Sequence, residues 1–123
     1  MKLIAADDSR LVRGIVAKTV ALAGYEAVHA ANGKEALNAL ETYGREIRLV
    51  LLDWNMPELS GIDVLKNMRA DDRYKNIPVL MVSTESEEDK IREAIRAGAQ
   101  GYLTKPFTPD QLIGAIHQVI GNH

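Results

Sequence analysis

Short apolar runs alternate with helical patterns along the whole of this chain, and that alternation limits the possible folds more than any other feature. Two of the runs, residues 49–52 and 79–82, contain no polar residue. Uninterrupted apolar runs are typical of strands that helices cover on both faces, as in a parallel sheet. The sequence therefore predicts five strands, over residues 3–8, 25–30, 48–53, 78–83 and 101–104.

Helical patterns follow the predicted strands and carry recognisable end signals. Ser9 and Asn32 are good N-cap residues, and Gly24 and Gly98 are suitable C-terminal stops for the first and fourth helices. Strand–helix alternation with right-handed crossovers predicts an α/β domain with a doubly wound parallel sheet. No linker or low-complexity segment interrupts it, so we expect residues 1–123 to form one domain. The first helix carries apolar residues at helical spacing: Leu11, Ile15, Val16 and Val20.

Composition excludes several classes of function. Apolar residues make up 46% and charged residues 26%, a balance typical of globular domains. There is no cysteine, so disulfides and thiolate metal sites are impossible. The net charge is −2, and the absence of a lysine and arginine cluster argues against direct nucleic-acid binding. Because no run approaches the roughly 20 apolar residues of a membrane span, and carboxylates follow the first apolar residues too soon for a signal peptide, we expect a cytoplasmic protein without membrane insertion.

Three aspartates fall at the ends of two predicted strands. Asp7 and Asp8 end the first strand, and Asp53 ends the third. Open α/β sheets bind ligands at the carboxyl edge where strand order reverses, and these carboxylates would share that crevice. Neighbouring carboxylates raise one another's pKa, and a hard cation such as Mg²⁺ relieves the repulsion. The alternative is that Asp7 and Asp8 serve only as acidic residues near a helix N-terminus.

A hydroxyl and an ammonium end two further predicted strands. Ser83 ends the fourth strand, and Lys105 follows the fifth. Near the aspartates, the lysine would act as a point-charge donor to a phosphate and the serine as a hydrogen-bond donor to a phosphoryl oxygen. The alternatives are a surface charge for Lys105 and a helix cap for Ser83. The histidines, which show no metal-ligand spacing, are expected at the surface: His29, His117 and His123.

Four ordered motifs give the chain a close resemblance to a known family. The receiver domain of bacterial response regulators is similar to this chain in DDS at 7–9, LLDWNMP at 51–57, PVLMVSTE at 78–85 and GYLTKPF at 101–107. The match covers essentially the whole chain and is greatest to free-standing chemotaxis regulators of the CheY type. It implies a flavodoxin-like (βα)5 fold with strand order 2-1-3-4-5 and a single receiver domain without an output domain. Family members usually have bulky residues before the acidic pair, so Ala5 and Ala6 predict looser packing there.

By position, the resemblance implies a role for each candidate residue. Asp53 would be the phosphoacceptor, which attacks the phosphoryl group on a histidine of a partner kinase. Mg²⁺ would be ligated by Asp8, Asp53 and the main-chain carbonyl of Asn55, and Asp7 would act through a metal-bound water. Lys105 would pair with the acyl phosphate, and the peptide between it and Pro106 is expected to be cis.

The same resemblance implies residues that switch conformation on phosphorylation and residues that set the rate of phosphate loss. Ser83 would move towards the phosphoryl group and Tyr102 would follow it inwards, which changes the surface made by the fourth helix, the fifth strand and the fifth helix. Asn55 and Glu85 occupy positions that tune how fast the phosphate is lost. Because this pair is the one found in fast-switching chemotaxis members, we expect a phosphorylated lifetime of seconds to minutes.

These expectations describe a stand-alone response regulator that acts by binding rather than as an enzyme. We expect a monomer that a chemotaxis histidine kinase phosphorylates on Asp53, that binds the flagellar motor switch, and that a phosphatase resets. A phosphorelay intermediate, a phosphate sink and a scaffold that is never phosphorylated are the alternatives within the family.

Two alternatives come from other classes of protein. A small Mg²⁺-dependent phosphatase of the haloacid dehalogenase type also uses an aspartate nucleophile. It needs a second aspartate as general acid, whereas this chain has Asn55, whose amide cannot perform that proton transfer. A flavodoxin-like cofactor binder fits poorly, because Asp7 and Asp8 would repel a flavin phosphate.

Overall fold

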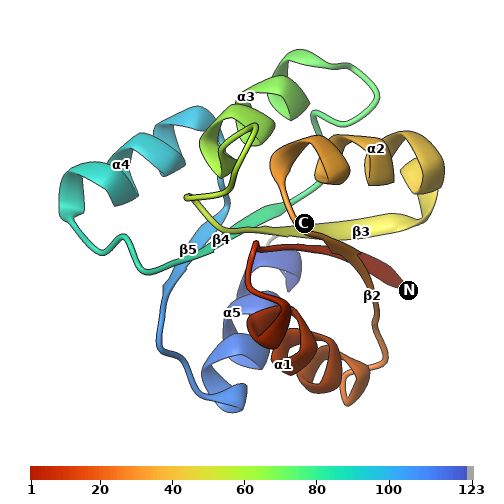
Figure 1. Ribbon diagram of the computed structural model, residues 1–123, viewed down its shortest axis with the longest axis vertical. Coiled ribbons are helices and arrows are strands. Elements are labelled where there is room, and N and C mark those ends of the chain that lie inside the picture. Colours follow the sequence, from red (N-terminus) through yellow and green to blue (C-terminus); the bar gives the residue numbers. More distant parts are fainter. Residues whose placement is uncertain (122–123) are drawn as a thin grey trace.

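The structure, a computed structural model, describes residues 1–121 and consists of one parallel sheet flanked by helices (Figure 1). Its five strands lie in the predicted order β2-β1-β3-β4-β5. The strands are β1 (Lys2–Ala6), β2 (Glu26–Ala30), β3 (Ile47–Leu52), β4 (Val79–Ser83) and β5 (Gly101–Thr104). The helices are α1 (Arg10–Ala21), α2 (Gly33–Tyr43), α3 (Gly61–Ala70), α4 (Glu88–Ala97) and α5 (Pro109–Gly121), with a 3₁₀ turn at Gly44–Glu46. Residues 122–123 of the predicted domain, including His123, lie outside the described residues.

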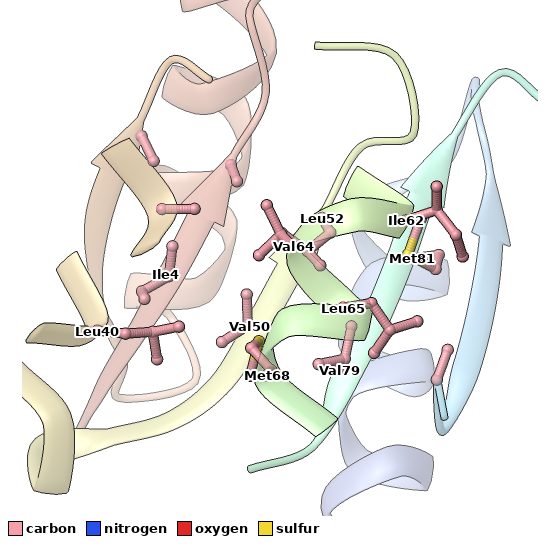
Figure 2. Packing of buried hydrophobic residues seen from close by; sticks show 14 of the residues in the cluster. Ile4, Leu40, Val50, Leu52, Ile62, Val64, Leu65, Met68, Val79 and Met81 are labelled. Atoms are coloured by element: carbon pink, nitrogen blue, oxygen red, sulfur yellow. The ribbon is translucent and has the colours of Figure 1, made fainter. Parts of the chain in front are cut away.

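Helices cover both faces of the sheet, which explains the uninterrupted apolar runs. α1 and α5 lie on one face, and α2, α3 and α4 lie on the other (Figure 1). Successive strand residues alternate between two buried clusters, so Leu51 packs with residues of α1 and α5 whereas Leu52 packs with residues of α2 and α3. Figure 2 shows the second of these clusters, with labels on Ile4, Leu40, Val50, Leu52, Ile62, Val64, Leu65, Met68, Val79 and Met81.

Helix ends carry the signals that the sequence indicates. The Ser9 side chain accepts a hydrogen bond from Val12 N at 3.2 Å, which caps α1. The Asn32 side chain likewise accepts one from Glu35 N at 2.8 Å and caps α2. Gly98 follows α4 with a φ of +112°, a conformation that residues with a Cβ rarely adopt. The sequence therefore determines most of these boundaries locally.

The first helix differs from its prediction in two ways. It ends three residues before Gly24, whose φ of +87° instead shapes the turn into β2. Val16 and Val20 are buried, whereas Leu11 and Ile15 are 75% and 45% exposed. Helical spacing alone cannot distinguish these pairs, because the arrangement of the sheet and α5 decides which side of α1 is covered.

Two expectations concern the surface of the domain. His29 and His117 are exposed, as predicted. Within residues 1–121, every helix is too short or too polar to cross a membrane.

Candidate functional site

The carboxyl edge of the sheet brings together the residues that follow four of its strands. Asp7 and Asp53 come directly after β1 and β3, which are neighbours in the sheet. The main chain stays paired beyond the strands, because Asp53 N donates to Ala6 O at 2.9 Å. Ser83 is the last residue of β4, and Lys105 N, just after β5, donates to its carbonyl at 2.9 Å. The sheet thus places these side chains around one crevice.

Asp7, Asp8 and Asp53 form one acidic cluster, as predicted. One carboxylate oxygen from each lies within 4.8 Å of the others. Asp7 and Asp53 are 6% and 7% exposed, whereas Asp8 is exposed to solvent. The cluster offers only oxygen donors, which suit a hard cation such as Mg²⁺ better than a soft metal. Asn55, the fourth expected ligand through its carbonyl, lies two residues after Asp53 at the same edge.

Lys105 bridges two of the three aspartates. Its Nζ donates to Asp7 Oδ2 at 2.5 Å and to Asp53 Oδ2 at 3.0 Å. The side chains of Lys105, Asp7 and Asp53 are only 14%, 8% and 9% exposed, so these ion pairs are shielded from water. The surface-charge alternative for Lys105 is therefore wrong, and its ammonium lies where it could meet a group attached to Asp53.

The surroundings raise the pKa of both Asp53 and Lys105, with opposite consequences for their charged forms. Burial raises the pKa of Asp53 above its ordinary value, although hydrogen bonding and attraction from Lys105 act against that shift. Burial alone would lower the pKa of Lys105, but its hydrogen bonds to Asp7 and Asp53 outweigh this and raise it. Lys105 is therefore firmly protonated, while the ionised form of Asp53 is disfavoured. A cation bound here would relieve that penalty.

A second set of contacts, in which no cation takes part, converges on Glu85. Its main-chain N donates to the Ser83 side chain at 3.2 Å, and its carbonyl accepts from the Tyr102 hydroxyl at 2.6 Å. Its carboxylate accepts from Asn55 Nδ2 at 3.0 Å. The fully buried Ser83 does not cap α4, because that helix follows Glu87, so the helix-cap alternative is wrong. The residues expected to switch and to tune are thus joined through one residue.

Comparison with known proteins identifies the family to which this site belongs. The family described as response regulator receiver domain matches residues 3–117. The chain belongs to this family. Its membership excludes the haloacid dehalogenase and flavin-binding alternatives, and it agrees with the flavodoxin-like arrangement of strands.

The receiver domain has close relatives among chemotaxis proteins. Chemotaxis protein CheY1 of Helicobacter pylori is 40% identical over 100% of this chain and 99% of that protein. A chemotaxis protein CheY homolog of Campylobacter jejuni is 37% identical over 98% and 93% of the two chains. The solved structure of Vibrio cholerae CheY4 is 37% identical, covers 96% and 97% of the chains, and superposes with a TM-score of 0.89. A Borrelia burgdorferi CheY, solved in complex with CheX, BeF₃ and Mg²⁺, is 26% identical over 97% and 88%, with a TM-score of 0.91.

Two glycines of the receiver domain hold the loop that follows Asp53, and sequence reasoning missed both. A Cβ on Gly61 would lie 1.9 Å from Asp53 O, and one on Gly33 would lie 2.2 Å from Leu59 O. Side chains at either position would therefore push this loop away from its present path. No local signal in the sequence reveals this, because the close approach arises only when the loop folds back onto the ends of α2 and α3.

The segment after β5 completes the surroundings of Lys105. The Lys105–Pro106 peptide is cis, as the resemblance implied. Beside it lies an apolar groove of about 370 Å³, which is lined by Val12, Ile15, Thr84, Lys105, Pro106 and Phe107. The exposed side of α1 therefore borders the approach to the acidic cluster.

Proposed function

We propose that this chain is a response regulator in which residues 1–123 form a single receiver domain. A histidine kinase phosphorylates it on Asp53 in a Mg²⁺-dependent reaction. The observation that carries this proposal is the partly buried Lys105 ammonium, which bridges Asp7 and Asp53 within a cluster of three carboxylates. An ammonium, a nucleophilic carboxylate and a set of oxygen donors are what transfer of a phosphoryl group requires.

The proposed reaction moves a phosphoryl group from a phosphohistidine to Asp53. A carboxylate oxygen of Asp53 forms the new P–O bond as the P–N bond breaks, and the imidazole of the kinase leaves with the bonding electron pair. Mg²⁺ held by Asp8, Asp53 and the Asn55 carbonyl, with Asp7 acting through water, would supply positive charge to the phosphoryl oxygens. Lys105 already lies 3.0 Å from Asp53 Oδ2, and it would pair with the phosphoryl group once that group is attached.

The added phosphoryl group then changes a surface. It brings about −1.5 to −2 charges and three acceptor oxygens, by analogy with other phosphorylated side chains. To donate to one of them, the Ser83 hydroxyl would leave its contact with Glu85 N, and Tyr102 would follow it inwards. Tyr102 lies on β5, so this movement alters the surface made by α4, β5 and α5.

The partners proposed for this surface come from the relatives. Proteins named chemotaxis protein CheY match along the full length of the chain, which supports a chemotaxis kinase as phosphodonor and the flagellar motor switch as target. A relative was solved in complex with CheX, which supports a further protein partner for this chain. The phosphatase that resets it would be another such partner. We infer that the chain works in the cytoplasm as a monomer that does not bind nucleic acid.

The test is phosphorylation by acetyl phosphate with and without Mg²⁺, followed by intact mass measurement. The wild-type protein should gain about 80 Da, one phosphoryl group, only when Mg²⁺ is present. Asp53→Asn should gain nothing. Asp72→Asn is the matched control, because this side chain is 94% exposed and far from the cluster in sequence, and it should gain the same mass as wild type.

The outcomes separate the proposal from its alternatives. No adduct on the wild-type protein, together with no binding of beryllofluoride, would favour a scaffold that is never phosphorylated. An adduct on Asp53 without phosphorylation-dependent binding to a motor switch protein would favour a phosphorelay intermediate or a phosphate sink.

A further inference from the structure

Arg13, in the first turn of α1, contacts the main chain of Asp7, a member of the acidic cluster. One terminal nitrogen of its guanidinium donates to the main-chain carbonyl of Asp7 at 2.6 Å. The side chain therefore reaches back over the turn between β1 and α1, the turn that carries Asp7 and Asp8. The contact joins the helix to the main chain of the site rather than to a carboxylate.

Helix formation alone does not account for a cation at this position. A positive charge in the first turn of a helix is opposed by the helix dipole, and α1 has no acidic residue in that turn to offset it. Arg10 lies in the same turn but is exposed, whereas Arg13 is partly buried beside the cluster. The partner that Arg13 meets is the main-chain carbonyl of Asp7, in the turn outside the helix.

Asp7 is fixed at every oxygen by a different donor. Its Oδ1 accepts from Ser9 N at 2.8 Å and its Oδ2 from Lys105 at 2.5 Å, while its carbonyl accepts from Arg13 at 2.6 Å. The bond from Lys105 uses the carboxylate that a cation would also need. The bond from Arg13 uses only the main chain, so it persists whatever the carboxylate binds.

A small cavity lies under the same turn. Within residues 1–121, Arg13 Nε is the buried side-chain nitrogen that has no hydrogen-bond partner. A cavity of about 10 Å³ lies in the same region, and its lining includes Ala5, Asp7 and Arg13. Ala5 and Ala6, where the sequence predicts looser packing, are among the residues that border it. The atoms that face this cavity are apolar, so the contact that holds the guanidinium is its hydrogen bond to the Asp7 carbonyl.

We propose that Arg13 is a positioning residue for the acidic cluster: it holds the main chain of Asp7 so that the carboxylates of Asp7 and Asp8 keep the spacing that a divalent cation needs. This inference rests on the proposed function, because it assumes that Mg²⁺ binds at the cluster. Residues that hold metal ligands in place typically affect metal affinity without touching the metal.

The experiment compares the Mg²⁺ affinity of Arg13→Met with that of Arg10→Met by calorimetric titration, well below the melting temperature of each variant. Both substitutions remove one positive charge from the same helical turn, but only the first removes the bond to Asp7. We expect Arg13→Met to raise the Mg²⁺ dissociation constant about tenfold over Arg10→Met. Arg13→Lys, which retains a donor and the charge, should restore part of the affinity.

A merely structural role predicts a different result. Arg13→Met would then have a lower melting temperature than Arg10→Met in EDTA. If the two folded variants nevertheless bound Mg²⁺ equally well, the inference would be overturned. If Arg13→Met does not fold, the same comparison with glutamine at both positions decides the matter. Wild-type protein that takes up phosphate with Mg²⁺ while the two variants bind Mg²⁺ equally would refute the role of Arg13 alone. Wild-type protein that binds no Mg²⁺ would refute both proposals.

Discussion

The acidic cluster and the contacts around Glu85 lie at one edge of the sheet, but opposite kinds of interaction hold them. In the cluster, two buried aspartates share one partly buried lysine, and burial raises the pKa of Asp53. Around Glu85, two of the three contacts are hydrogen bonds between neutral groups, made by its main-chain N and carbonyl. A change of charge in the cluster therefore changes stability strongly. The neutral contacts can rearrange at a much smaller change in free energy, which suits a surface that must switch.

The largest loss of stability is expected from a substitution at Gly61, where the loop after Asp53 is packed tightly against the helix that follows it. Gly61→Ala would place a Cβ 1.9 Å from Asp53 O, so the loop must move. We expect a loss of about 3 kcal/mol in the free energy of unfolding, measured by urea denaturation. The control is Gly14→Ala in α1, where no heavy atom lies within 4 Å of the added Cβ. That change should instead stabilise by about 1 kcal/mol through helix propensity. Equal stability of the two variants would contradict this view of the loop.

The second effect tests whether charge dominates the cluster. Lys105→Met leaves Asp7 and Asp53 buried without their shared cation and should lower the free energy of unfolding by about 2 kcal/mol at pH 7. Because hydrogen bonds raise the pKa of Lys105 in the folded state, its contribution is complete at neutral pH and disappears only as the pH rises through that raised value. In acid the loss should shrink as the aspartates become protonated.

A surface lysine provides the control for that measurement. Lys75 pairs with Asp72, but the two side chains are 51% and 94% exposed. Lys75→Met should therefore change stability by less than about 0.5 kcal/mol. A similar loss in both variants would mean that burial does not distinguish the cluster from an ordinary surface pair.

The third substitution is expected to stabilise the metal-free protein rather than destabilise it. Asp53→Asn should raise the melting temperature by about 3 °C in metal-free buffer, because it removes a carboxylate whose ionised form burial disfavours. The folded pKa of Asp53 is raised, so the gain should be complete above that pKa and should vanish as the pH falls to the ordinary aspartate range. Adding Mg²⁺ should reduce the gain, since it stabilises the wild-type protein alone. A lower melting temperature than wild type would show that the bond to Lys105 outweighs the cost of burial.

These contrasts also separate what the sequence could predict from what it could not. The acidic cluster was predictable, because Asp7 and Asp53 follow strands that read as parallel, and the carboxyl ends of such strands share an edge. The contacts of Arg13 and Gly61 were not predictable, because each depends on how a loop folds back on the strand ends. The exposure of Leu11 was missed for a similar reason, since spacing marks an apolar side chain but not which side of a helix its neighbours cover.

The smallest effect on stability is expected at Glu85, where the neutral contacts lie. Glu85→Ala keeps the main-chain bonds to Ser83 and Tyr102 and loses only the exposed bond from Asn55. The free energy of unfolding should therefore change by less than about 0.5 kcal/mol. The lost bond joins the loops after β3 and β4, and one of its partners is two residues from Asp53, so we expect it to restrict the approach of water to a phosphoryl group there. Its loss should shorten the phosphorylated lifetime about threefold, which corresponds to about 0.6 kcal/mol in the barrier.

The measurement is the decay of the phosphoprotein in excess Mg²⁺ after the donor is removed, followed by intact mass. The wild-type protein should decay in seconds to minutes, and a lifetime of hours would contradict the assignment of Asn55 and Glu85 as a fast-switching pair. Ser86→Ala is the control, because this exposed neighbour makes no side-chain hydrogen bond among residues 1–121. If Glu85→Ala decays as slowly as this control, the Asn55 contact does not restrict water. The rate of phosphate loss would then depend on the charged cluster rather than on the network beside it.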